Sequence, residues 1–253
     1  MITRRLFAAL LLLVVAVVMP AATIDSLKTV ADSAFAKEDY ETASTYYKRI
    51  TEMGESSEIC YNLGCCYYRM DDMAKSVLWF ERAALLNPSD ADIRFNLDMA
   101  RSKTIDRITP RHEMFFAAAW HSMTLWRSAD EWAICAVVFF VLMLILLTVY
   151  FFSPNIAVRK TGFFGALLSL FIVLLSNALA YSQREMQVER TGAIIMKPAV
   201  TIKSTPSAGG TDLFVLHEGT RVEILDNSMK EWVEVQIADG KVGWMERKQL
   251  EQI

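Results

Sequence analysis

Two long apolar runs stand out when the sequence is scanned for the spacing of its apolar and polar residues. They extend from Trp132 to Phe152 and from Phe163 to Tyr181, and neither contains a charged residue or a proline. Because a helix rises about 1.5 Å per residue, about 20 residues cross a hydrocarbon core of about 30 Å. Each run is close to that length, and the connecting segment S-P-N-I-A-V-R-K-T-G is too short to be a domain. A transmembrane hairpin is therefore predicted over residues 132–181.

The alternative for these runs is a pair of buried helices in a soluble protein. Core helices of this length nearly always carry a polar stripe, and the first run, W-A-I-C-A-V-V-F-F-V-L-M-L-I-L-L-T-V-Y-F-F, has none. In the second run, Gly165, Ser169 and Ser176 suit close packing against the first helix. No charged residue lies inside either run, so a substrate channel has no support.

The few positive charges around the hairpin indicate its orientation. Arg159 and Lys160 stand in the connecting segment without an acid, and the extreme N-terminus likewise carries Arg4 and Arg5. The positive-inside rule places both clusters in the cytoplasm. Since a hairpin returns the chain to the side it came from, the segments on either side of it then share the periplasm. We therefore expect a multi-pass protein of the bacterial inner membrane with both soluble domains in the periplasm.

Residues 1–22 have the layout of a secretory signal. A charged start is followed by an apolar run and by a small-residue end at Ala21 and Ala22. Pro20 occupies a position where a signal peptidase prefers a small residue. The segment is therefore expected to be either a cleaved signal peptide or a lasting N-terminal anchor, and both outcomes export the domain on its C-terminal side.

Helical repeats are predicted over residues 23–108. The stretch Y-N-L-G-C-C-Y-Y-R-M-D-D-M-A-K-S-V-L-W-F-E-R-A-A-L-L-N-P carries a tetratricopeptide signature. In such a unit Gly64 permits a close approach of two helices, Ser76 lies where they cross, and Phe80 packs across the pair. A more degenerate unit precedes it, with Ala43 in the place of Ser76. A generic helical bundle is the alternative.

An unpaired capping helix is expected to close the repeats. Pro88 ends the second unit, and the next segment, S-D-A-D, has Ser89 as its expected N-cap, with Asp92 three residues on. Apolar residues such as Leu97 continue the helical pattern. A terminal helix of this kind covers the end of a repeat stack.

The inner face of such a stack is the candidate partner site, because it comes mainly from the first helix of each repeat. Aromatic rings with a few amides can hold an extended or helical peptide there. A carboxylate clamp is not expected, since Lys28 and Asn62 match such a set but Asp32 departs from it. With barely two repeats, a domain that contacts only its own neighbour is the alternative. The expected partner-binding residues are Lys28, Phe35, Tyr61, Asn62, Cys65, Tyr68, Phe95 and Asn96.

Residues 109–131 are predicted to form an amphipathic segment at the membrane interface. Phe116, Trp120 and Trp126 fall on one helical face, and Arg127 follows them. Aromatic rings facing lipid beside a cation near the phosphates suit an interfacial helix. A helix packed on the repeat domain is the alternative.

Residues 182–253 are predicted to be a polar linker and a small β-barrel. Short alternating runs are separated by turn signals; the runs are A-I-I-M, V-T-I, L-F-V-L, R-V-E-I-L, E-W-V-E-V-Q and V-G-W-M. Several short strands in so short a segment indicate a barrel, and L-H-E-G-T-R-V-E-I-L followed by D-G-K-V-G-W-M resembles the bacterial SH3-like fold. Gly240 is expected in a hairpin turn and Gly243 at a close strand approach. Trp232 and Trp244 are expected in the core or at its rim.

No recognisable catalytic or metal-binding set is present. The cysteines, at 60, 65, 66 and 135, do not have the spacing of a zinc site. Neither a nucleophile elbow nor a glycine-rich phosphate loop occurs. An exported thiol cluster sensing oxidants is an alternative to small core residues. We therefore expect no enzyme, no cofactor and no metal. With a formal net charge of −3 and no basic patch, nucleic acid is not an expected partner.

The order of the segments is more specific than any one of them. Y-N-L-G…F-E-R-A…N-P, then F-N-L-D-M-A-R…I-D-R-I, then the apolar hairpin and L-H-E-G-T…G-W-M span nearly the whole chain. This order resembles the repeat-containing, BatE-type branch of the Bacteroides-aerotolerance (Bat) family. The resemblance implies a non-catalytic inner-membrane component beside von Willebrand factor A-type membrane proteins and a MoxR-type ATPase. It further implies a role in envelope maintenance or in tolerance of oxygen stress.

We therefore expect a multidomain membrane protein with an all-α tetratricopeptide-repeat domain, a two-helix transmembrane hairpin and a small all-β SH3-like barrel. Its expected partners are membrane lipid and other proteins, held by the repeats and the barrel of a non-catalytic scaffold. The alternative function is an anchor that binds peptidoglycan or another envelope polymer.

Overall fold

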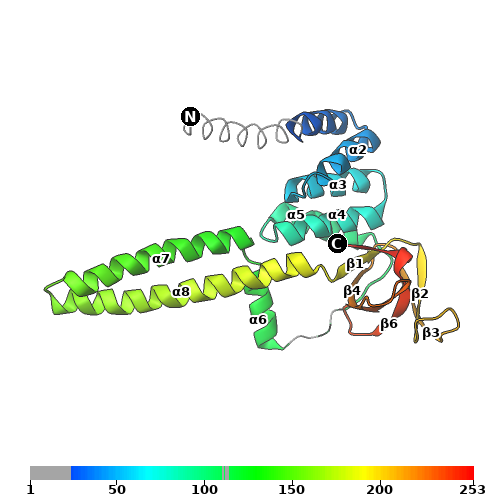
Figure 1. Ribbon diagram of the computed structural model, residues 1–253. Coiled ribbons are helices and arrows are strands. Elements are labelled where there is room, and N and C mark those ends of the chain that lie inside the picture. Colours follow the sequence, from blue (N-terminus) through cyan, green and yellow to red (C-terminus); the bar gives the residue numbers. More distant parts are fainter. Residues whose placement is uncertain (1–23, 110, 112–113) are drawn as a thin grey trace, which may run out of the picture.

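The computed structural model describes residues 24–109, 111 and 114–253, and it consists of a helical stack, a long two-helix hairpin and an antiparallel sheet (Figure 1). The stack and the sheet lie together at one end of the hairpin, and we call them the head. The predicted fold class is confirmed. The segment 1–22, predicted to be a signal peptide or anchor, lies outside the described residues.

The helical stack begins with helical residues 24–36 and continues through α2 to α5. Each of these later helices begins at a side chain that accepts a hydrogen bond from a backbone N–H of the first turn, which satisfies donors that have no partner within the helix. The bounds are α2 Tyr40–Thr51, α3 Ser57–Arg69, α4 Met73–Leu86 and α5 Ala91–Ser102, with N-caps Asp39, Ser56, Asp72 and Asp90.

The N-cap of α5 is Asp90, so the expectation of Ser89 was wrong by one residue. Oδ1 of Asp90 accepts from the backbone N–H groups of Asp92 at 2.8 Å and of Ile93 at 3.2 Å. Ser89 instead donates its hydroxyl to Oδ1 of Asn87, at 2.9 Å. The longer carboxylate side chain of Asp90 reaches two free N–H groups at once, whereas the Ser89 hydroxyl has a partner outside the helix.

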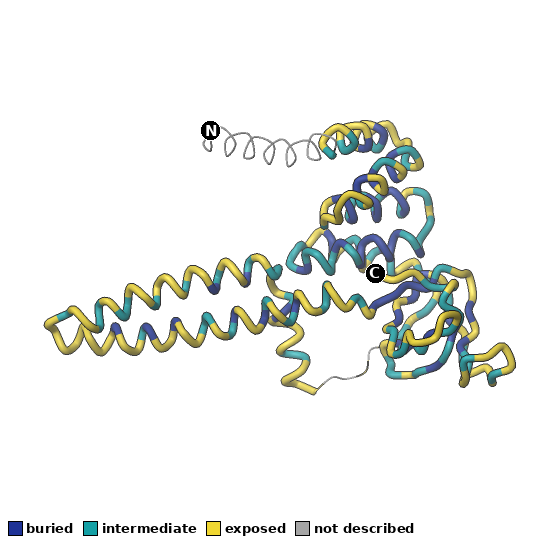
Figure 2. The backbone as a smooth tube through the Cα atoms, viewed as in Figure 1, coloured by how far each residue is buried: buried dark blue, intermediate teal, exposed yellow. Residues whose placement is uncertain are grey.

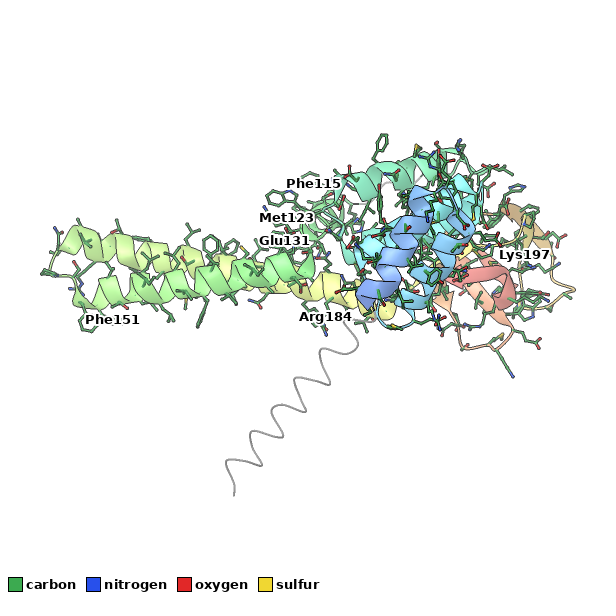
Figure 3. The ribbon with its side chains drawn as sticks, turned by 90° about the horizontal axis from the view of Figure 1, so that it is seen from above. Phe115, Met123, Glu131, Phe151, Arg184 and Lys197 are labelled. Carbon is green, nitrogen blue, oxygen red and sulfur yellow. The ribbon has the colours of Figure 1, made fainter. Side chains whose placement is uncertain are left out.

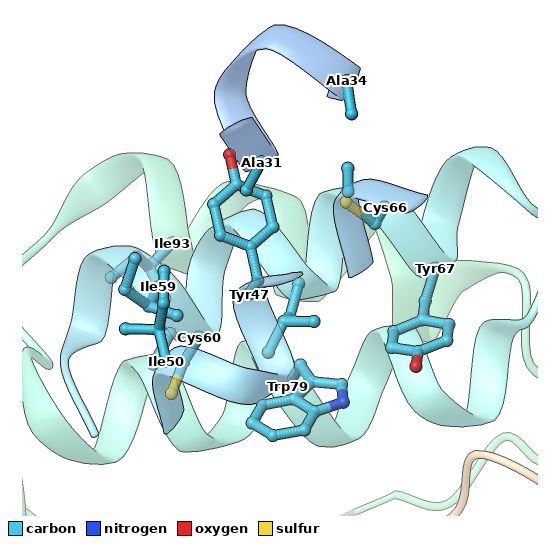
Figure 4. Packing of buried hydrophobic residues seen from close by; sticks show 13 residues of the cluster. Ala31, Ala34, Tyr47, Ile50, Ile59, Cys60, Cys66, Tyr67, Trp79 and Ile93 are labelled. Carbon is cyan, nitrogen blue, oxygen red and sulfur yellow. The ribbon is translucent and has the colours of Figure 1, made fainter. Parts of the chain in front are cut away.

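The close approach of α3 and α4 forms the centre of the stack. The Phe80 ring lies against Gly64, and Oγ of Ser76 donates to the Gly64 carbonyl at 3.0 Å. Tyr47, from α2, and Trp79, from α4, belong to the buried cluster that joins the two repeats (Figure 4). These contacts are the ones that the repeat signature predicts for Gly64, Ser76 and Phe80.

The hairpin consists of α7 (Ala129–Phe152) and α8 (Ile156–Glu189), both long and apolar enough to cross a membrane. Their outward faces are largely exposed (Figure 2). Gly162 approaches the backbone of Tyr150, and Oγ of Ser176 donates to Sγ of Cys135 at 3.5 Å, so small residues line the contact.

The helices of the hairpin extend further than the apolar runs in the sequence. The turn is confined to residues 153–155, because Oδ1 of Asn155 caps α8 through the Ala157 N–H at 2.9 Å. Arg159 and Lys160 therefore lie on α8 rather than in a loop. At its other end α8 continues through the polar residues 182–189, which were expected to be a linker.

A short helix, α6 (Phe115–Thr124), precedes the hairpin, packs against α8 and runs crosswise to it near the head (Figures 1 and 3). Thr124 is its buried residue, while Phe115, Phe116 and Trp120 are exposed.

The sheet has seven strands in the order β3-β2-β6-β5-β4-β1-β7, and every neighbouring pair is antiparallel. Its bounds are β1 Gly192–Ile195, β2 Ala199–Lys203, β3 Asp212–His217, β4 Arg221–Asp226, β5 Trp232–Gln236, β6 Val242–Glu246 and β7 Leu250–Gln252. The last strand follows a 3₁₀ turn and was not expected from the sequence.

Gly240 and Gly243 of the sheet occupy the turn and the close strand approach that were predicted for them. Gly240 has φ +92° in the β5–β6 turn, and a Cβ on Gly243 would lie 2.5 Å from Cγ2 of Ile202. Trp232 and Trp244 are half-buried, whereas Met245, next to Trp244 on β6, is fully buried. The tryptophans therefore belong to the rim and not to the core.

Candidate functional site

A groove of about 540 Å³ opens on the repeat stack. Its walls come mainly from the first helices of the repeats, with Phe35 in the helix at residues 24–36, Tyr61 and Tyr68 in α3, and Asn96 in α5. The residues that line it are Phe35, Tyr61, Asn62, Cys65, Tyr68, Arg69, Phe80, Asn96 and Met99. The groove thus combines aromatic walls with two amides and a cation.

The structure brings most of the sequence-predicted partner residues together in this groove, but not Lys28 or Phe95. Nζ of Lys28 pairs with Oε1 of Glu58 at 2.9 Å and with Oδ2 of Asp32 at 3.7 Å. Phe95 is 68% exposed on α5 and does not line the groove. Both side chains lie on the stack outside the groove.

Three lining residues were not among those predicted: Arg69, Phe80 and Met99. Helical spacing carried a signal for two of them, because Arg69 lies one turn beyond Cys65 and Met99 lies three residues beyond Asn96. Phe80 was assigned to the contact between helices. Its ring serves both purposes, since it packs against Gly64 and also reaches the groove.

The polar groups of the groove are held by their neighbours. Nδ2 of Asn96 donates to the Tyr61 hydroxyl at 3.0 Å, and the Tyr61 ring packs on Phe80 with centroids 5.6 Å apart. Burial raises the pKa of Tyr61 to about 12, so its hydroxyl remains a neutral donor and acceptor at neutral pH. Nζ of Lys103 lies 4.1 Å from the centroid of the Tyr68 ring.

The cysteine thiols of the stack are poorly suited to act as nucleophiles or to react with oxidants. Burial raises the pKa of Cys60 and of Cys66 to about 12, and both side chains are inaccessible. Burial also raises the pKa of Cys65, which lines the groove, although the Tyr61 hydroxyl and Arg69 act in the opposite direction. Thiols held neutral in this way are weak nucleophiles. Among the described residues, no cluster of His, Cys, Asp and Glu side chains could hold a metal ion.

The sheet packs on the outer helix α4 and leaves the groove open. Leu78 and Val77 of α4 form a buried cluster with Ile194 of β1 and with Ile253. Glu81 of α4 is buried and pairs with Arg101 of α5 and, at 3.6 Å, with Arg221 of β4. The stack and the sheet therefore form one continuous body.

Asp106 is the polar centre of a second contact between the stack and the sheet. Its Oδ2 accepts from the backbone N–H of His217 at 2.7 Å and from Oγ1 of Thr220 at 2.6 Å, while Oδ1 lies 2.8 Å from Nδ1 of His217. Burial opposes ionisation of this carboxyl, but the hydrogen bonds from Thr220 and His217 outweigh it and lower the pKa of Asp106.

A third contact joins the end of α8 to the stack. Arg190, directly after α8, donates to the Glu55 carboxylate, and this hydrogen bond lowers the pKa of Glu55. Nε2 of Gln187 donates to the Leu85 carbonyl at 3.1 Å. The hairpin is therefore attached to the repeats as well as to the sheet.

Comparison with protein families identifies two modules in this arrangement. A tetratricopeptide repeat matches residues 57–90, and a bacterial SH3 domain matches residues 198–251. The chain contains both modules. The bacterial SH3 match excludes β1, the strand that packs on α4. No match was found among curated proteins.

The two matches coincide with elements of the structure. The tetratricopeptide repeat begins with α3 and ends just after α4, so it includes the Gly64–Phe80 contact and most of the groove. The bacterial SH3 match covers β2 to β6 and ends within β7. Both modules are typically non-catalytic and point in general to protein or envelope partners.

Proposed function

We propose that this protein is a non-catalytic scaffold whose repeat groove holds a segment of a partner protein. The observation that carries the proposal is the open groove on the stack, lined by the rings of Tyr61, Tyr68 and Phe80, while the sheet packs elsewhere on α4. Aromatic walls supply apolar contact area, and the Asn62 amide supplies hydrogen bonds to a peptide backbone. Asn96 adds its Oδ1 as an acceptor, because its Nδ2 already donates to Tyr61 and to the Asp92 carbonyl.

The hairpin is the proposed membrane anchor. Both α7 and α8 are long and apolar enough to span a bilayer, and the head lies at one end of the pair. Arg159 and Lys160 lie at the opposite end, on α8. The positive-inside rule then places these cations in the cytoplasm and the head, with both of its domains, in the periplasm of a bacterial inner-membrane protein.

The order of modules supports a more specific assignment within this proposal. A tetratricopeptide-repeat domain at 23–108, an interfacial segment at 109–131, a membrane hairpin at 132–181 and an SH3-like domain at 182–253 resemble the BatE-type branch of the Bat family. The proposed partners are then von Willebrand factor A-type membrane proteins and a MoxR-type ATPase system. The process served would be tolerance of oxygen stress.

Crosslinking in native membranes, followed by identification of the trapped proteins, tests the scaffold. Tyr68→Ala removes a groove wall and is expected to abolish capture of a partner that the unaltered protein traps. Phe95→Ala is the matched control, because it removes an exposed aromatic ring of the same stack outside the groove. Equal capture by all three proteins would show that the groove is not the binding site.

Binding of an envelope polymer is the second candidate, favoured by the free edge of the sheet. Strand β3 is an edge strand, and Leu213 and Val215 on it are about half exposed, at 48% and 49%. Sedimentation of the detergent-solubilised protein with purified cell wall tests this candidate. Co-sedimentation that Val215→Ser weakens would support it, and an unsedimented protein would exclude it.

A further inference from the structure

A second pocket lies at the end of the hairpin away from the head. Its volume is about 310 Å³, and it is lined by Tyr150, Ile156, Arg159, Lys160, Phe163 and Phe164. Figure 3 shows the neighbouring Phe151 at this far end, whereas Arg184 lies at the end near the head. The pocket thus has an aromatic and aliphatic floor with two cations beside it.

Neither cation of the pocket is neutralised within the described residues. No ion pair involves Arg159 or Lys160 there; the guanidinium of Arg159 lies over the Tyr150 ring, 5.5 Å from its centroid. Asp130 and Glu131 open α7, and Glu185 and Glu189 follow the apolar part of α8. All four acids lie at the opposite end of the hairpin.

The backbone adds to this positive charge. Arg159 and Lys160 lie at the end of the first turn of α8, near the positive end of the helix dipole, where cations are disfavoured. The adjacent carbonyl end of α7 offers only partial negative charge, and one of its carbonyls, that of Val149, already accepts from the Ser153 N–H at 3.0 Å. An anion between the two side chains would relieve the unfavourable placement.

We propose that this pocket binds the phosphate of an anionic phospholipid. Arg159 and Lys160 contact the phosphate, and Phe163, Phe164 and Ile156 contact the glycerol region and the start of the acyl chains. A lipid is favoured over a free phosphate ion because four of the six lining residues are aromatic or aliphatic. The inference rests on the proposed membrane insertion of α7 and α8.

Native mass spectrometry of the full-length protein released from nanodiscs tests the site. The nanodiscs contain phosphatidylglycerol and phosphatidylcholine in equal amounts, and the number of each retained lipid is measured. Each basic residue near an anionic surface raises the binding constant roughly fivefold. Two basic residues therefore predict that phosphatidylglycerol is enriched about 25-fold over phosphatidylcholine in the most tightly retained lipid. Arg159→Gln with Lys160→Gln should abolish that enrichment, whereas Arg184→Gln should preserve it.

A charge-relocated variant separates a pocket from general surface attraction. Adding Ala157→Lys and Thr161→Lys to the double variant restores the charge on the same helix but outside the lining residues. The proposal expects no recovery of the tightly retained lipid. Full recovery of phosphatidylglycerol enrichment would show that general surface charge, and not the pocket, retains the lipid. Loss of the lipid on addition of inorganic phosphate would show that the site binds phosphate rather than a phospholipid. Failure to enter nanodiscs at all would instead contradict the membrane anchor.

Discussion

Phe80 of α4 and Gly64 of α3 are in a contact that only glycine permits. A Cβ added at Gly64 would lie 2.5 Å from Cδ1 of the Phe80 ring. The same ring forms part of the groove and packs against Tyr61. This contact therefore contributes both to the close approach of α3 and α4 and to the shape of the groove.

Gly64→Ala is expected to destabilise the second repeat by about 1–3 kcal/mol, the usual cost of overpacking a core. Hydrogen–deuterium exchange of the protein in detergent would show it as faster opening of α3 and α4. Gly54→Ala is the control, because no atom lies within 4 Å of the added Cβ. Unchanged amide protection of α3 and α4 in the Gly64 variant would mean that the two helices accommodate the added methyl group without loss of stability.

Asp106→Asn is expected to weaken the contact between the stack and the sheet by about 2 kcal/mol. The amide loses the charge that strengthens the bonds from His217 and Thr220. Spin labels at Thr45→Cys and Lys230→Cys would measure the distance between the two parts, and the distribution should broaden. Asp98→Asn, an exposed carboxylate of the same stack, should leave the distribution narrow.

Acid is expected to loosen this contact and also the contact that Arg190 makes with Glu55 of the stack. The pKa values of Asp106 and Glu55 are lowered in the folded protein, so their contribution to stability is complete above their ordinary values and is lost as the pH falls through the lowered ones. The loss should therefore begin below about pH 4. The spin-label distance should broaden there, and Asp106→Asn should make the change smaller. A distance that stays constant to about pH 2 would contradict this assignment.

Cys60 and Cys66 are expected to resist peroxide and iodoacetamide in the folded protein. With a pKa of about 12, either thiol is almost entirely protonated at neutral pH, and both are buried. Mass spectrometry after brief treatment should find them unmodified, with Cys65 reacting before them because it lines the groove. Rapid oxidation of Cys60 or Cys66 would contradict this prediction and support the alternative in which the thiols sense oxidants.

The aromatic residues of α6 and of the turn after it are expected to contact lipid. Trp126 is 65% exposed next to the start of α7, and its ring meets Trp132 with centroids 6.3 Å apart. In liposomes, a variant with Trp126 as its single tryptophan should be quenched by lipids brominated near the headgroup. A variant with only the buried Trp79 should not be quenched. Equal, weak quenching in both would exclude an interfacial position for Trp126 and the turn after α6.

Much of the fold follows from local patterns in the sequence. The repeat signature predicts the contacts of Gly64, Ser76 and Phe80 because it specifies which residues must be small where two helices meet. Uninterrupted apolar runs predict α7 and α8, and alternating runs predict β1 to β6. Most groove residues were also predicted, since the first helix of a repeat lines the inner face.

The features that the sequence did not reveal depend on contacts between distant segments. The packing of β1 on α4 joins residues more than a hundred positions apart, and Ile194 looks like any other strand residue. Strand β7 is too short for an alternating pattern and exists because β1 offers it a free edge. Arg159 and Lys160 are the exception, because the Asn155 cap that places them on α8 is a local signal that was not recognised in the sequence.

The continuity of α8 has a geometric consequence. The helix runs from the hairpin turn to Glu189 and is followed after residues 190–191 by β1, while Arg190 is held by Glu55. Each residue inserted between 182 and 189 would rotate the groove by about 100° about the helix axis and raise it by about 1.5 Å. Insertions of about four or about seven residues, which are close to one and two whole turns, would nearly restore the direction in which the groove faces. In the proposed membrane-anchored protein, the direction in which the groove faces relative to the bilayer would thus follow from the rotational phase of α8.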